Sequence, residues 1–126
     1  MRKQYHLRKT KSWFNAWDVH NLVQLSKNIE EISVDIESIK ELDENFWYQD
    51  NDSIPTCRSI AEHIGLIQNT DLKYPIILSE EWRVMDGMHR VLKAYINWDT
   101  KIQAKRFTQT PAPNYTDIKL DELTYD

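Results

Sequence analysis

The residues best suited to chemistry form one short run, Asp86-Gly87-Met88-His89-Arg90. This run comes after extended apolar residues and opens a helical pattern, so it predicts the start of a helix. The first amide N–H groups of a helix have no partner inside it and carry partial positive charge. Such a start accepts phosphate or carboxylate groups. Gly87, one of two glycines in the chain, would let the backbone approach a ligand closely.

Two side chains beside this glycine would act on an anion in opposite ways. Arg90 can hold a phosphate through two parallel hydrogen bonds, and His89 lies in the same helical turn. The carboxylate of Asp86 repels an anion. Asp86 could instead be the N-cap of the helix, a role worth about 1 kcal/mol, or it could hold a divalent cation that bridges to phosphates. The sequence leaves both roles open.

The surrounding sequence predicts the elements that position this motif. Residues 74 to 107 read as strand, strand, turn, helix and strand, because extended apolar runs precede the motif and alternation follows it at Ile102 and Ala104. An earlier strand is expected over residues 32 to 36, where apolar and polar residues alternate. The helix after the motif should bury one apolar face, formed by Met88, Val91, Leu92, Tyr95 and Ile96.

A further helix is expected over residues 12 to 28. Its apolar and aromatic residues recur at three- and four-residue spacing, at Trp13, Ala16, Trp17, His20 and Val23. The two tryptophans should cover the sheet, and a peptide-binding groove or a homodimer face is the alternative.

Another helix is expected after Pro55, with Thr56 as its N-cap. Its expected buried face consists of Ile60, Ala61, Ile64 and Ile67. Gly65 either permits close packing against the sheet or marks a break in the helix. Arg58 in the first turn could hold the far end of a polyphosphate or form a surface salt bridge.

Two carboxylates are followed by three aromatic residues in the segment from residue 43 to residue 48. Such a segment suits the wall of a pocket, where burial raises the pKa of a carboxyl group, and a solvated acidic loop is the alternative. The polar residues Gln49 to Ser53 could form a mobile lid. His63 could be a surface histidine or an acid or base in a pocket.

Length and composition predict one domain over residues 1–126 in a reducing cytoplasm. The net charge of −4 and the pI near 5.5 argue against a nucleic-acid partner. One cysteine excludes an internal disulfide, and no signal peptide or membrane-spanning apolar run is found. A basic N-terminal arm, residues 1–12, could be solvated or touch an acidic partner. Residues 108–126 form an acidic tail that contains prolines and either packs back onto the body or moves freely.

The motif resembles the ParB/sulfiredoxin superfamily. There, a strand ends at glycine and the next helix opens with a basic residue: Gly-Glu-Arg-Arg in ParB partition proteins, Gly-Gly-Cys-His-Arg in sulfiredoxins and Asp-Gly-His-His-Arg in a free serine kinase branch. The chain is most similar to the last, and small stand-alone ParB-like proteins with PT-x-R, YPIIL and MDGMHR segments are more similar still. The resemblance covers residues 34 to 107. It implies an α/β (α+β) fold of the ParB/sulfiredoxin type, a small mixed sheet flanked by helices.

The chain departs from the superfamily at two points. Met88 stands where sulfiredoxins carry their reactive cysteine, and Cys57 lies in another segment, so sulfiredoxin activity is not expected. The residues after the last expected strand are too few for the DNA-binding and dimer domains of partition ParB.

The resemblance implies that the chain binds a nucleoside di- or triphosphate with Mg²⁺. Asp86 would hold the metal, and the residues Gly87, Met88, His89 and Arg90 would surround the phosphates. Thr56 and Arg58 would hold the far end of the polyphosphate.

The implied activity is phosphoryl transfer to a small hydroxyl substrate. Glu44 would orient that substrate, with Asp43 as the next candidate, and Asp86 and His89 would complete the catalytic set. Two alternatives remain: a nucleotide-binding switch without catalysis, related to partition ParB, and a nuclease, against which the acidic charge argues.

Overall fold

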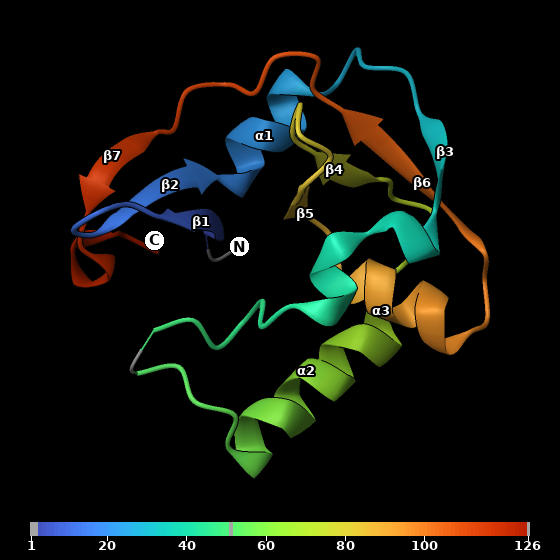
Figure 1. Ribbon diagram of the computed structural model, residues 1–126, viewed down its shortest axis with the longest axis horizontal. Helices are drawn as coiled ribbons and strands as arrows, with labels where there is room; N and C mark the ends of the chain where they lie inside the picture. The colour runs from blue at the N-terminus through green and yellow to red at the C-terminus, as the bar shows by residue number, and fades with distance from the viewer. Residues whose placement is uncertain (1–2, 51, 126) are drawn as a thin grey trace.

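The computed structural model describes residues 3–50 and 52–125. Within this part of the chain, three α-helices and two sheets form a small α+β fold, as predicted (Figure 1). The larger sheet has the strand order β3 (Ile32–Asp35), β6 (Lys101–Arg106), β4 (Ile76–Leu78) and β5 (Val84–Asp86). The smaller sheet is antiparallel, in the order β1 (Tyr5–Lys9), β2 (Phe14–Asp18) and β7 (Tyr115–Ile118).

The larger sheet is mixed, and its strands β4 and β5 carry buried apolar side chains on both faces. Strand β6 pairs antiparallel with β3 and parallel with β4, and β4 pairs antiparallel with β5. Side chains alternate between the two faces of a strand. One face therefore packs against α3 (Met88–Ile96), and the other face, through Ile77 and Met85, packs against Trp17 and Leu22. This arrangement buries the strand that leads into the predicted motif.

The smaller sheet corrects two predictions for the N-terminal segment. Residues 5–9 of the expected basic arm form strand β1. The expected helix over residues 12–28 begins as β2, and only α1 (Val19–Leu25) is helical. Strand β2 pairs with strands on both sides, and Asp18 then caps α1 by accepting a hydrogen bond from the amide of His20 at 2.9 Å. Pairing with distant strands thus outweighs the helical spacing of the aromatic residues.

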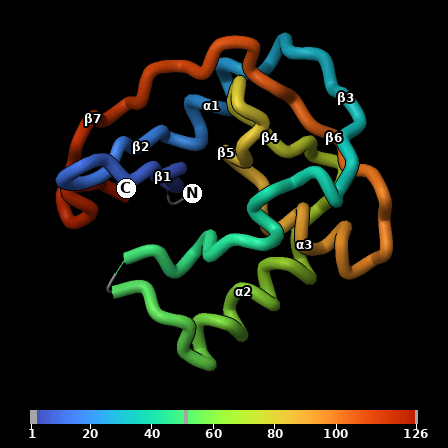
Figure 2. Tube along the Cα trace, viewed as in Figure 1, coloured from blue at the N-terminus to red at the C-terminus, as the bar shows by residue number. Residues whose placement is uncertain are grey.

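The C-terminal tail returns to the smaller sheet. Figure 2 shows the chain passing from β6 over α1 to β7, beside β2. On this path Trp17 donates a hydrogen bond from Nε1 to the carbonyl oxygen of Pro111 at 2.7 Å, and Leu123 is buried. The tail therefore packs onto the body, one of the two arrangements that the sequence left open.

Helix α2 (Cys57–Asn69) begins after Thr56, as predicted, but its expected buried face is wrong. Ile67 is buried, whereas Ile60 and Ile64 are 44% and 48% exposed. The helix lies at the periphery of the molecule, where it packs on α3 rather than on a sheet (Figure 1). A Cβ atom at Gly65 would meet nothing within 4 Å, so this glycine does not serve close packing. In the described residues, no helix is both long and apolar enough to cross a membrane.

Candidate functional site

The predicted motif lies where β5 ends and α3 begins. Gly87 is the N-cap of α3 and has a left-handed backbone, with φ of 105°. No side chain caps this helix, so the N-cap role predicted for Asp86 is wrong. A Cβ atom at position 87 would lie 2.7 Å from Nη2 of Arg90 and 2.7 Å from Cγ2 of Ile76. Both the backbone conformation and the lack of space therefore require glycine here.

The start of α3 opens on a cavity of about 270 Å³, which we call the helix-start cavity. Its walls include residues from β1, from the loop before α2 and from the motif, among them His6, Phe46, Trp47, Asp86 and His89. The amide of Val91 donates to the carbonyl of Gly87 at 3.1 Å. Within the described residues, the amides of Met88, His89 and Arg90 have no hydrogen-bond acceptor. These N–H groups are the donors that an anion needs at a helix start.

Arg90 does not reach the helix-start cavity. Its Nη2 donates to Oδ2 of Asp86 at 3.1 Å and to the carbonyl oxygen of Pro75 at 3.3 Å. The side chain is mostly buried, because long side chains in a helix point back toward its N-terminus. The predicted grip of Arg90 on a phosphate is thus replaced by an internal ion pair, which also neutralises Asp86.

Two histidines and a tryptophan form a stack beside the motif. Nδ1 of His63, on α2, lies 2.9 Å from Nε2 of His89, on α3. The indole of Trp47 stacks on both imidazoles, with ring centroids 3.9 Å from His63 and 4.8 Å from His89. Burial lowers the pKa of His89 to about 4, helped by the nearby His63 and Arg90, and burial also lowers the pKa of His63. Both rings are therefore neutral at pH 7 and can donate or accept a hydrogen bond.

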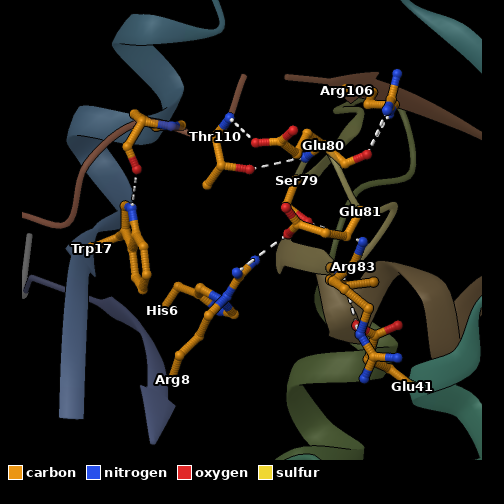
Figure 3. Close-up of polar contacts among 12 residues, drawn as sticks. His6, Arg8, Trp17, Glu41, Ser79, Glu80, Glu81, Arg83, Arg106 and Thr110 are labelled. Atoms are coloured by element: carbon orange, nitrogen blue, oxygen red, sulfur yellow. Dashed lines mark hydrogen bonds and ion pairs between the residues drawn. The ribbon is translucent and has the colours of Figure 1, made fainter. Parts of the chain in front are cut away.

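His6, from β1, also lines the helix-start cavity. Burial, followed by the charge of Arg8, lowers its pKa to about 4. Arg8 donates from Nε to Nε2 of His6 at 3.2 Å, lies over the ring of Trp17 and forms an ion pair with Glu81 at 3.4 Å (Figure 3). The sequence predicted a basic arm here, either solvated or touching an acidic partner, and so these residues were missed.

Three other predicted site residues lie away from the helix-start cavity. Glu44 forms an ion pair with Arg83 and lines a neighbouring cavity. Thr56 caps α2 by accepting a hydrogen bond from the amide of Ser59 at 3.1 Å, and Arg58 is exposed in the first turn of that helix. Neither Thr56 nor Arg58 lines the cavity. The structure thus brings together Asp86, Gly87, Met88 and His89 from the predicted set.

The predicted lid, Gln49 to Ser53, borders the same cavity. Gln49, Asp50 and Ser53 line it, and residue 51 lies outside the described residues. Asp50 accepts hydrogen bonds at Oδ1 from the amide of Asp52 at 2.8 Å and at Oδ2 from the hydroxyl of Ser53 at 3.1 Å. These bonds hold the Asp50 side chain against the residues that follow it.

A metal at this site would have one carboxylate ligand. The described residues contain no group of three His, Cys, Asp or Glu side chains that could hold a metal ion. Mg²⁺ can bind through one carboxylate together with substrate phosphates and water, so Asp86 fits this limited role once it is freed from Arg90. Such an ion would neutralise phosphate charge.

Comparisons with family models, curated proteins and solved structures returned no significant match. The resemblance to the ParB/sulfiredoxin superfamily therefore rests on the motif residues and their placement between a strand and a helix.

Proposed function

We propose that this protein binds a nucleotide, or another small molecule with a phosphate group, in the helix-start cavity. The observation that carries the proposal is the uncapped start of α3, where the amide N–H groups of Met88 and His89, two residues that line the cavity, lack acceptors among the described residues. A helix start of this kind attracts an anion through its amides and its dipole.

The cavity walls support this proposal. The imidazole of His89 is neutral at pH 7 because burial lowers its pKa, so it can donate a hydrogen bond to a phosphate oxygen. Phe46 and Trp47 line the same cavity and present aromatic surface on which the rest of a nucleotide can pack. A bound nucleotide would place its phosphates at the donors and its remaining atoms against the aromatic rings.

The ion pairs favour a binding module over a phosphotransferase. Asp86 and Glu44, the residues that phosphoryl transfer would require, are paired with Arg90 and Arg83. Catalysis would need both carboxylates to be released, whereas binding needs neither. A phosphotransferase with Mg²⁺ on Asp86 is the second candidate, because Asp86 lines the cavity beside the free amides.

Calorimetry with pyrophosphate and nucleoside diphosphates, with and without Mg²⁺, tests the proposal. Binding should be measurable and should weaken at least about fivefold in His89→Ala, because a charged acceptor loses a donor. The matched control is Arg58→Ala, which should bind normally because Arg58 lies outside the cavity. Equal affinity of His89→Ala and the wild type would reject this site.

A second assay distinguishes the two candidates. The phosphotransferase predicts consumption of a nucleoside triphosphate in the presence of small hydroxyl compounds, and weaker Mg²⁺-dependent binding in Asp86→Asn. The binding module predicts no stoichiometric product, and an effect of Asp86→Asn that is the same with Mg²⁺ and with a chelator.

A further inference from the structure

A second cavity, of about 500 Å³, adjoins the helix-start cavity. We call it the charged cavity, because its walls include Arg8 from β1, Glu41 and Glu44 from the segment after β3, and Arg83 from the turn before β5. The two cavities have four lining residues in common, His6, Leu7, Phe46 and Gln49. One ligand can therefore extend from the first cavity into the second.

Glu41 leaves one carboxylate oxygen of the charged cavity without a partner. The residue is 3% exposed, although carboxylates are rarely buried. Its Oε2 accepts from the amide of Val84 at 2.8 Å and pairs with Nε of Arg83 at 3.1 Å. Its Oε1 is buried and has no hydrogen-bond partner among the described residues. A buried acceptor left unpaired is costly, so a ligand that donates to it gains affinity.

Arg8, which also lines the charged cavity, has one donor without a partner among the described residues. Its Nε and Nη1 are engaged with His6 and Glu81, as Figure 3 shows, whereas Nη2 is buried with no partner in the described chain. Two of the side chains that line the charged cavity therefore have an unpaired buried atom in the described chain: Glu41 has an acceptor, and Arg8 has a donor. Both atoms are closed to solvent, so rotation of the two side chains toward the cavity would bring them to a ligand group with the complementary pair, a donor and an acceptor.

We propose that the charged cavity holds the base of the bound nucleotide, and that Glu41 selects bases with an exocyclic amino group. The proposal rests on the proposed function, because it requires the phosphates to lie at the start of α3. The amino group of adenine, cytosine or guanine donates to Oε1 of Glu41. A ring nitrogen or carbonyl oxygen of the same base accepts from Nη2 of Arg8. Phe46, which lines both cavities, offers a ring for stacking.

The pairs CDP and UDP, and ADP and IDP, test this selection by calorimetry. Within each pair, the second nucleotide has a carbonyl group in place of the amino group, and its oxygen would face the carboxylate of Glu41. We expect UDP and IDP to bind about tenfold more weakly than their partners, because a buried acceptor is then left unpaired against another acceptor. The comparison uses the wild-type protein, so it does not depend on the folding of a variant.

Variants assign the selection to Glu41. Glu41→Gln replaces one carboxylate oxygen with an amide that can donate, so the preference for the amino base should disappear or reverse. Asp35→Asn is the matched control: Asp35 also forms an ion pair, with Lys101, but it is exposed and lies outside both cavities, and the variant should keep the preference. Thermal unfolding shows whether each variant is folded. A preference that the folded Glu41→Gln variant keeps overturns the assignment.

Pyrophosphate separates this proposal from the proposed function, because it lacks a base. If pyrophosphate binds and the paired nucleotides bind equally well, the base selection is overturned and the phosphate site stands. If neither pyrophosphate nor any nucleotide binds, both proposals are overturned. If pyrophosphate binds equally to the wild type and Glu41→Gln while the CDP preference is lost, both are supported.

Discussion

The helices α2 and α3 begin in opposite ways. At the start of α2, Thr56 has an extended backbone, and its hydroxyl accepts a hydrogen bond from the amide of Ser59. At the start of α3, Gly87 has a left-handed backbone and no side chain to offer. The first helix start is exposed, whereas the second opens on the helix-start cavity.

The start of α2 is arranged to stabilise its helix, whereas the start of α3 suits the proposed binding of an anion. A capping side chain satisfies amides that would otherwise need water or a ligand, and it stabilises the helix. A glycine N-cap leaves those amides available and brings the backbone to the cavity wall. The two starts belong to neighbouring helices joined by the hydrogen bond between His63 and His89, so their behaviour can be compared within one protein.

The largest effect is expected for Gly87→Ala. An alanine must adopt φ of 105° and place its Cβ atom 2.7 Å from Arg90 and Ile76. The conformational strain and the overpacking together should lower the free energy of unfolding by about 2–5 kcal/mol. Gly65→Ala is the control, because Gly65 is helical with open space around it and alanine should stabilise by about 0.5–1 kcal/mol. Urea denaturation measures both, and equal effects would contradict the special role of Gly87.

Acidification should lower the free energy of unfolding through two buried histidines that line the helix-start cavity, His6 and His89. The pKa values of His6 and His89 are about 4 in the folded chain against 6.5 without burial. Between these values the unfolded chain binds more protons, so stability is full above pH 6.5 and falls as the pH drops toward 4. For His6 alone the loss is about 3 kcal/mol.

Urea denaturation from pH 7 to pH 4 measures this loss. His6→Gln cannot be protonated in this range, so its stability should depend less on pH than that of the wild type. An unchanged slope in the variant would show that His6 is not buried in its neutral form.

Arg90→Ala should affect stability more than ligand binding. The variant leaves Asp86 without its partner and exposes the space beside Ile76, so the free energy of unfolding should fall by about 2 kcal/mol. Because Arg90 lies outside the helix-start cavity, the affinity for pyrophosphate should change less than about threefold. A large loss of affinity in folded protein would instead show that Arg90 leaves Asp86 to hold the phosphate.

The smallest effect is expected for Thr56→Ala. Loss of the cap should cost about 1 kcal/mol of stability. Pyrophosphate affinity should not change, because Thr56 does not line the helix-start cavity. Calorimetry that showed weaker binding would restore Thr56 to the phosphate site that the sequence suggested.

The sequence predicted the order of elements from β4 to β6 well because its signals are local, but the expected buried face of α3 was partly wrong: Tyr95 and Ile96 are exposed, and Ala94 is buried. Apolar runs mark β4 and β5, Gly87 marks the turn, and the helical spacing from Met88 marks α3. The direction of Arg90 was missed because its partner Asp86, four residues earlier, lies at the end of β5 and not on the helix.

Contacts between distant residues could not be predicted from the sequence. Trp13, Ala16 and Trp17 have helical spacing, but pairing with β1 and with β7, about 100 residues later, makes this segment a strand. His63 and His89 meet across 26 residues, and Glu41 and Val84 across 43. Such contacts depend on the fold, and no spacing in one sequence reveals them.

The helix-start cavity depends on the smaller sheet, which can be completed only after β7 has been synthesised. His6 and Leu7 line that cavity from β1, which pairs with β2, and β2 is completed on its other side by β7 near residue 115. During synthesis β2 therefore remains an open edge until residues 115 to 118 have left the ribosome. A nascent chain that lacks β7 should bind the proposed ligand poorly even though every residue of the motif has already been made.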